Sequence, residues 1–91
     1  MKIVFSGRAW KDYLWWQSHD PQMLERINSL IEECLRSPFR GRGKPEPLKK
    51  DLSGWWSRRI TDEHRLVYRV EAKGADQRLE VAQCRFHYGE R

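Results

Sequence analysis

The sequence predicts an α+β domain in which an N-terminal strand and a two-helix hairpin pack on a twisted, mainly antiparallel sheet of four to five strands. Three observations predict it. The chain begins with a short apolar run, continues with two segments of helical spacing, and ends with segments rich in aromatic and β-branched residues between turn-forming residues. With 91 residues and 38% hydrophobic content, we expect one domain, residues 1–91, around a single core.

The first half predicts one strand and two helices. Residues 3–5, Ile-Val-Phe, predict a strand and are too few for a signal-peptide core or a membrane span. Ser6 is a favoured cap for a first helix, and Asp20 followed by Pro21 is typical of the start of a second, which Ser37-Pro38 should end. The apolar positions of these helices are Trp10, Tyr13, Leu14, Leu24, Ile27, Leu30, Ile31, Cys34 and Leu35. Trp10, Trp16 and Trp56 are expected in the core.

The second half predicts a loop and then an antiparallel meander. Glycines, prolines and lysines over residues 39–54 indicate a loop, with a brief strand at 47–49. Strand composition follows over residues 55–60, 65–71 and 78–88, interrupted by the turn-like stretches 61–64 and 73–76.

Strand alternation predicts one face of the sheet toward the helices and one open face. The helix side should hold Trp56, Ile60, Leu66, Tyr68, Val70, Ala82, Cys84 and Phe86. The open face should hold Trp55, Ser57, Arg59, Arg65, Val67, Arg69, Gln83, Arg85 and His87. Arg65 and His87 are therefore expected on one surface.

Composition narrows the partner and the compartment. Eighteen Lys and Arg against thirteen Asp and Glu give a net charge of +5, which favours a polyanionic partner such as nucleic acid, although an ordinary basic protein has the same balance. Cys34 and Cys84 show no metal-ligand spacing and are expected to be buried free thiols in a reducing compartment. These observations predict a cytoplasmic protein with no membrane partner.

The residues with chemical potential are an acid, several arginines and a histidine. Glu46 stands between two prolines in GRGKPEPLKKDLSGWWSRRI, and His87 closes the last strand-like segment. No HExxH, clustered carboxylates or Walker-type loop is present, so we expect neither a metal site nor a cofactor. RNA carries its own nucleophile, the 2′-hydroxyl, so a metal-free nuclease needs a base, a cationic phosphate clamp and an acid.

The strings KPEPLKKDLSGWWSRRI, EHRLVY and CRFHY resemble the YoeB toxins of the RelE/YoeB superfamily, over nearly all of residues 1–88. The resemblance implies a RelE-like, microbial-RNase-like fold. It also implies the toxin of a type II toxin-antitoxin system, a ribosome-dependent endoribonuclease that cleaves messenger RNA in the decoding (A) site. A YefM-type antitoxin would neutralise it, and operator DNA would be met only indirectly, through the antitoxin complex.

The same resemblance assigns residues. Glu46, Arg65 and His87 match the catalytic positions, and Lys49, Arg59 and Tyr88 match substrate contacts; Trp55 joins them because it is an aromatic on the arginine-bearing face. Our hypothesis makes Glu46 the general base, His87 the general acid, and the two arginines the phosphate clamp. The chain departs from the family by a short C-terminal extension, residues 89–91, which leaves the role of Tyr88 open.

Other interpretations stay open at the level of residues. An isolated Glu46 is more often a solvated loop carboxylate, and strand arginines are more often surface charges. A non-catalytic basic module that binds RNA or the ribosome and blocks translation fits the composition equally well, whereas a DNA-binding repressor lacks an obvious recognition helix. Self-association through the helices is compatible with Trp15, which lies off the main apolar stripe of the first helix.

Overall fold

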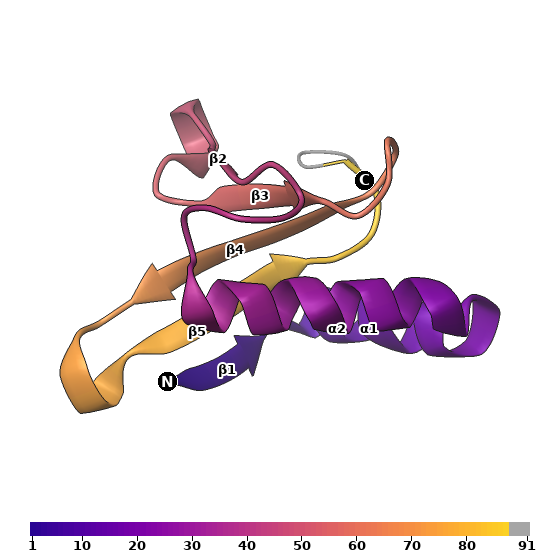
Figure 1. Ribbon diagram of the computed structural model, residues 1–91, viewed down its shortest axis with the longest axis horizontal. Helices are drawn as coiled ribbons and strands as arrows, with labels where there is room; N and C mark the ends of the chain where they lie inside the picture. The colour runs from indigo at the N-terminus through magenta and orange to yellow at the C-terminus, as the bar shows by residue number, and fades with distance from the viewer. Residues whose placement is uncertain (88–91) are drawn as a thin grey trace.

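A computed structural model describes residues 1–87 and places two helices on one face of a five-stranded sheet (Figure 1). The sheet order is β1-β5-β4-β3-β2; β1 runs parallel to β5 and every other neighbouring pair is antiparallel. The elements are β1 (Lys2–Phe5), α1 (Gly7–His19), α2 (Pro21–Arg36), β2 (Glu46–Pro47), η1 (Lys50–Leu52), β3 (Trp56–Arg59), β4 (Arg65–Glu71), η2 (Gly74–Asp76) and β5 (Arg78–Gln83). The predicted fold class is confirmed.

The helix boundaries follow the predicted caps. The Ser6 hydroxyl accepts a hydrogen bond from the Ala9 N–H at 3.0 Å, and the Asp20 carboxylate accepts one from the Met23 N–H at 3.2 Å. Each bond satisfies an N–H that the first helical turn leaves without a partner. The chain therefore turns back sharply after His19, and the two helices pack side by side.

The core lies between the helices and the sheet. It contains Ala9, Trp16, Ile27, Leu30, Ile31, Cys34, Ile60, Leu66, Tyr68, Leu79, Val81 and Cys84. The predicted faces of β3 and β4 are confirmed, because Trp56 is opposite Tyr68 while Ser57 is opposite Val67. Trp10 departs from the prediction: its side chain is 50% exposed beside the edge strand β1. No helix within residues 1–87 is long and apolar enough to cross a bilayer.

The last strand is shorter than predicted. β5 ends at Gln83, and residues 84–87 bend away from the sheet, with Phe86 in the left-handed region at φ 66°. The cause is competition for the backbone: the Asp12 carboxylate accepts the Cys84 N–H at 3.0 Å, and His64 Nδ1 accepts the Phe86 N–H at 2.8 Å. These bonds take up two N–H groups that a longer strand would have used for its ladder, while the Phe86 carbonyl still accepts from the Arg65 N–H on β4.

The bulge in β5 and the bend that follows the strand each correct one predicted orientation. Val81 is opposite Tyr68 and Gln83 is opposite Val67, so Ala82 is an extra residue in a β-bulge. Ala82 lines a cleft on the open face instead of facing the helices. Arg85, expected on the open face, lies against α1 with its guanidinium 3.5 Å from the centre of the Trp15 ring. The brief strand also differs from the predicted residues 47–49, since β2 begins one residue earlier and ends two residues earlier, at Glu46–Pro47.

Candidate active site on the open face

The open face carries its polar residues in rows that follow the strand register. Glu46 is opposite Ser57, Ser57 is opposite Val67, and Val67 is opposite Gln83. The next row along β3 and β4 is the pair Arg59 and Arg65. Diagonal neighbours on a sheet lie roughly 7–8 Å apart, so Glu46 is one diagonal step from Arg59. The pleat therefore unites the predicted acid and both predicted clamp residues on one surface.

Glu46 is an exposed carboxylate on an edge strand. Pro45 and Pro47 restrict the backbone on either side of it, and both fit here because an edge strand can lack outward N–H donors. The strand is anchored by the Leu48 N–H, which donates to the Trp55 carbonyl at 2.9 Å. The side chain is thus presented to solvent from a stiff backbone.

Arg65 uses one nitrogen of its guanidinium, Nη1, for hydrogen bonds to the backbone of the preceding turn. The residue is only 8% exposed, and its Nη1 donates to the carbonyls of Thr61, Asp62 and His64 at 2.7 to 3.1 Å. Its Nε and Nη2 make no hydrogen bond within residues 1–87, which leaves donors for an anion. Arg65 is thereby held in place by the turn before β4.

Arg59 complements Arg65 on the facing strand. It is half-buried, and its Nε is a buried donor without a hydrogen-bond partner in the described part of the chain. Buried donors of this kind are costly unless a ligand or solvent satisfies them. Its backbone is fixed, since the Arg59 N–H donates to the Gly43 carbonyl at 2.7 Å and its carbonyl accepts from Arg26.

His87 is joined to this surface through the backbone beside Arg65. The Arg65 N–H donates to the Phe86 carbonyl at 3.0 Å, so the residue after Phe86 starts next to the clamp. His87 is half-buried, and its carbonyl accepts from the Gln83 side chain at 3.2 Å. The structure thus brings Glu46, Arg59, Arg65 and the His87 segment to one face.

The remaining predicted contacts lie farther from the arginine pair. Lys49 is exposed. It lies between β2 and η1, next to Leu48, whose N–H donates to the Trp55 carbonyl. Trp55 is half-buried, with the Arg69 guanidinium 4.3 Å from its ring centre. Together with Val4 and Ala82, Trp55 lines a cleft of about 500 Å³. Tyr88 lies outside the described residues.

Ion pairs order the part of the open face beside Trp55. Glu80 accepts from Arg78 and from Arg69, each at 2.7 Å. These hydrogen bonds, that from Arg78 first, hold the pKa of the Glu80 carboxyl below its usual range. Arg69 is consequently fixed over Trp55 and largely neutralised, unlike Arg59.

Sequence reasoning missed three residues that organise this face from behind or beside it. Arg58 is fully buried on the helix side, and Gln83 and His64 hold residues 85–87. A signal existed for Arg58, because the alternation that buries Trp56 and Ile60 places it on the same side. No local signal identified Gln83, since its contacts depend on the bend of residues 84–87.

The buried thiols carry no part of this surface. Burial raises the pKa of Cys34 to about 11 and that of Cys84 to about 12, so both are protonated at neutral pH. The prediction of buried free cysteines is confirmed. Within residues 1–87 no group of three or more His, Cys, Asp or Glu side chains could hold a metal ion.

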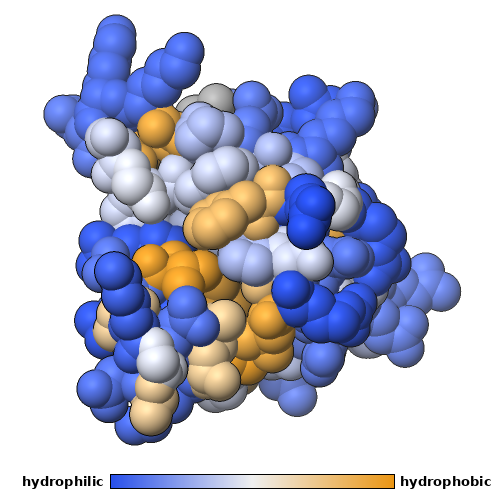
Figure 2. Space-filling model, turned by 60° about the vertical axis from the view of Figure 1, so that its left-hand side comes forward, coloured by the Kyte–Doolittle hydropathy of each residue, from blue (hydrophilic) through white to orange (hydrophobic). Residues whose placement is uncertain are grey.

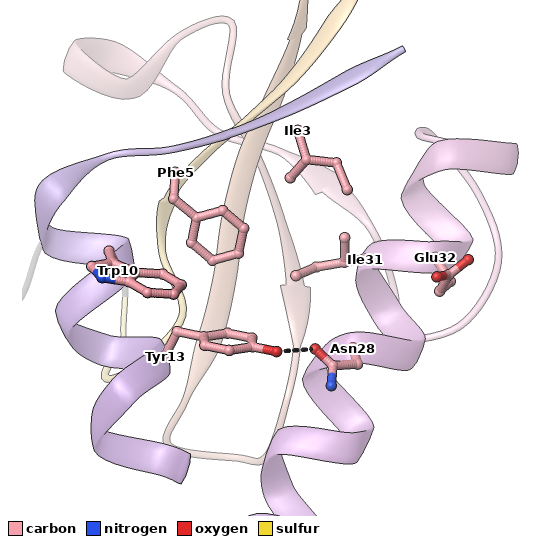
Figure 3. A pocket seen from close by; sticks show the side chains of 7 residues that line it. All are labelled: Ile3, Phe5, Trp10, Tyr13, Asn28, Ile31 and Glu32. Atoms are coloured by element: carbon pink, nitrogen blue, oxygen red, sulfur yellow. Dashed lines mark hydrogen bonds between the residues drawn. The ribbon is translucent and has the colours of Figure 1, made fainter.

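A second cleft lies on the helix side of β1 and differs in character (Figure 3). It also measures about 500 Å³ and is lined mainly by apolar and aromatic side chains, among them Ile3, Phe5, Trp10 and Tyr13. Two of its lining residues are joined by a hydrogen bond, in which the Tyr13 hydroxyl donates to Asn28 at 2.9 Å. Figure 2, in which the left-hand side of Figure 1 comes forward, shows hydrophobic patches among hydrophilic residues. None of the catalytic candidates Glu46, Arg65 and His87, all of them within residues 1–87, lines this cleft.

Comparison with known sequences finds one family along most of the chain. The profile described as "YoeB-like toxin of bacterial type II toxin-antitoxin system" matches residues 5–88. The Toxin YoeB of Escherichia coli K12 is 54% identical over 88 residues, covering 97% of this chain and all of that protein.

Comparison with solved structures finds the same family. A YoeB/ParE toxin from Agrobacterium tumefaciens superposes with a TM-score of 0.94 at 60% identity, covering 97% of this chain and all of that one. A YoeB dimer and a heterotetrameric YoeB-YefM complex, both from Staphylococcus aureus, match with TM-scores of 0.86 and 0.85 at 43% identity, over 97% of this chain and 98% of theirs. The RelBE2 complex of Mycobacterium tuberculosis, at 21% identity and a TM-score of 0.69, supports the fold alone.

Proposed function

This chain belongs to the YoeB toxin family of bacterial type II toxin-antitoxin systems, and on that premise we propose that it is a metal-independent endoribonuclease that cleaves messenger RNA in the ribosomal A site and so inhibits translation. The observation that carries the proposal is the single open face on which Glu46, Arg59, Arg65 and the His87 segment lie. A base, a cationic clamp and an acid are what cleavage by the 2′-hydroxyl requires.

The proposed mechanism uses each group once. Glu46 removes the proton of the 2′-hydroxyl, whose oxygen bonds to phosphorus while the bond from phosphorus to the 5′-oxygen breaks. Arg59 and Arg65 stabilise the negative charge that grows on the phosphoryl oxygens, and His87 protonates the departing 5′-oxygen. The products are a 2′,3′-cyclic phosphate and a 5′-hydroxyl. Each proton transfer of this kind contributes roughly 10²–10⁴-fold.

Three further residues support binding in this proposal. Lys49 adds a positive charge near the RNA backbone. Trp55 lines a cleft in which an RNA base would stack on its ring, because aromatic stacking is a common mode of single-stranded RNA recognition. Tyr88 keeps its proposed role as a substrate contact. Phosphate contacts alone read no sequence, so the ribosome is the partner that presents the message.

The relatives suggest the protein partners. A YoeB-YefM complex and a YoeB dimer are known from S. aureus, so we propose that a YefM-type antitoxin and a second copy bind this chain too. Trp15 is a weak candidate for the dimer contact, since Arg85 and His19 stack against it at 3.5 and 4.2 Å. Operator DNA would be reached only through the antitoxin complex.

The decisive experiment looks for new RNA ends. The chain is expressed briefly, and 5′ ends and ribosome footprints are mapped across the transcriptome for wild type, Glu46→Ala and His87→Gln. Wild type should create 5′-hydroxyl ends within ribosome-covered codons, and both variants should lose them while still associating with ribosomes. Intact messages, with translation inhibition that Glu46→Ala leaves unchanged, would instead identify a non-catalytic ribosome-binding inhibitor.

A further inference from the structure

We propose that Gln83 is a positioning residue that sets the place of the His87 imidazole by holding the backbone of residues 85–87. This inference rests on the proposed function, because it assigns Gln83 a role only through the catalytic histidine. Gln83 is the last residue of β5 and faces the same side of the sheet as Val67, its partner on β4. It lies next to the row of arginines without being one of the charged groups.

The side-chain amide of Gln83 bonds to consecutive backbone carbonyls. Its Nε2 lies 3.0 Å from the Arg85 carbonyl oxygen, 3.2 Å from that of His87 and 3.4 Å from that of Phe86. An amide nitrogen has two hydrogens, so the bonds to Arg85 and His87 are the principal ones and Phe86 shares a hydrogen. Gln83 is 4% exposed, so water offers these carbonyls little replacement.

The bend needs such a support because its conformation is not self-sustaining. Phe86 has a φ of 66°, which costs energy for a side chain with a Cβ and persists only where neighbours impose it. Asp12 and His64 fix the N–H groups of Cys84 and Phe86, upstream of the histidine. Gln83 bonds to the carbonyl of His87 itself, so it acts at the residue whose position matters.

The functional consequence follows from the geometry of proton transfer. A general acid has to lie within hydrogen-bond reach of the leaving oxygen, and a displacement of about 1 Å can lower the rate about 10²-fold. In the proposed function, the described residues that bind RNA are Arg59, Arg65, Lys49 and Trp55. The Gln83 side chain makes its hydrogen bonds within residues 1–87 to the backbone of residues 85–87 and to none of these four. Loss of the Gln83 donors should therefore lower kcat and leave KM nearly unchanged.

The test compares Gln83→Met, which keeps the length without donors, and Gln83→Glu, which keeps the shape but places acceptors against carbonyls. On ribosomes programmed with a defined message, each should lower kcat roughly 10- to 100-fold at constant KM. In a double-mutant cycle, adding Gln83→Met to His87→Gln should cost nothing more. Wild-type kcat in both single variants, a change confined to KM, or additive losses in the cycle would each overturn the proposal.

Controls separate positioning from stability and from the proposed function. Val70→Ala removes a partly buried side chain on the helix face of β4, and it should lower the unfolding midpoint without lowering kcat. The His87 imidazole resonances of folded Gln83→Met should shift or broaden while those of His19 stay in place. If wild type cleaves nothing, the proposed function fails; if it cleaves and the Gln83 variants match it, only the role of Gln83 fails.

Discussion

Arg58 and Arg59 are neighbours on β3, but the pleat places their side chains on opposite faces of the sheet, where they differ in burial and in hydrogen bonding. Arg58 is fully buried and donates to the Tyr68 hydroxyl at 3.1 Å and to the carbonyls of Ser37, Arg40 and Arg42 at 2.6 to 2.9 Å. Arg59 faces the open side and keeps a buried Nε without a partner among residues 1–87.

The difference shows how one basic motif supplies both structure and a site. The helix face gives each of the three guanidinium nitrogens of Arg58 a hydrogen-bond partner, and that network ties the loop after α2 to the sheet that presents Glu46. The Tyr68 hydroxyl, whose pKa burial raises, extends the network by donating to the Pro38 carbonyl at 2.5 Å. Among residues 1–87, the open face leaves the Arg59 Nε without a hydrogen-bond partner, and such a donor is suited to binding an anion. Local charge alone does not separate these roles, whereas strand parity does.

The largest expected effect on the open face is that of Glu46→Gln. This change removes the proposed base and keeps the size of the side chain, so the cleavage rate on ribosomes should fall roughly 10²–10⁴-fold. Because Glu46 is exposed, the free energy of unfolding should change by less than about 0.5 kcal/mol. Urea unfolding checks the second expectation, and a large loss of stability would mean that Glu46 supports the fold.

Arg58→Met should produce the reverse pattern, a loss of stability first. The change leaves three carbonyls and a tyrosine hydroxyl without a buried donor, so we expect destabilisation of about 3 kcal/mol or more. Urea or thermal unfolding measures it. Arg59→Met is the matched control and should cost less than about 1 kcal/mol; equal losses in the two variants would refute the division between the faces.

In cleavage assays the order of the two variants should be reversed, with Arg59→Met losing more activity than Arg58→Met. A charge-assisted hydrogen bond to phosphate is worth roughly 1.5–3 kcal/mol, so Arg59→Met should lower kcat/KM about 10- to 100-fold. Where Arg58→Met remains folded, at low temperature, its activity per folded molecule should stay close to that of wild type. An Arg59→Met variant with full activity would remove it from the clamp and leave Arg65 alone in that role.

The smallest effect concerns the buried thiols and pH. Burial raises the pKa of Cys34 from 9.0 to about 11 and that of Cys84 from 9.0 to about 12, so their stabilising contribution is complete below pH 9. It is lost as the pH rises toward those values, because the unfolded chain ionises first. Between pH 8 and pH 10 each thiol should lower stability by about 1 kcal/mol. Replacing both cysteines with alanine should flatten this part of the unfolding profile.

Much of the fold could be predicted from the sequence because its signals are local. Caps at Ser6 and Asp20, helical spacing in α2 and alternation in β4 each depend on a few neighbouring residues. The end of β5 could not be predicted in this way. Its course depends on Asp12 and His64, which are 72 and 22 residues away from the N–H groups that they accept. The same long-range bonds explain why Arg85 was misplaced and Gln83 overlooked.

The site was partly predictable for the same reason. Strand parity placed Arg59, Arg65 and Trp55 on one face, and the structure confirms that placement. Strand parity did not reveal that Arg65 Nη1 donates to carbonyls of the turn at residues 61–64, because these hydrogen bonds require the folded shape of the turn. The catalytic roles of Glu46, Arg65 and His87 remain predictions for the experiments above.

The two prolines around Glu46 also shape how the molecule behaves in a crowded solution. Open sheet edges invite edge-to-edge polymerisation, since they offer unpaired N–H and C=O groups to any extended chain. β2 forms one such edge, but Pro45 and Pro47 carry no N–H and the strand is two residues long. Pro45 and Pro47, which stiffen the backbone at Glu46, therefore also make the β2 edge a poor site for another strand to pair with.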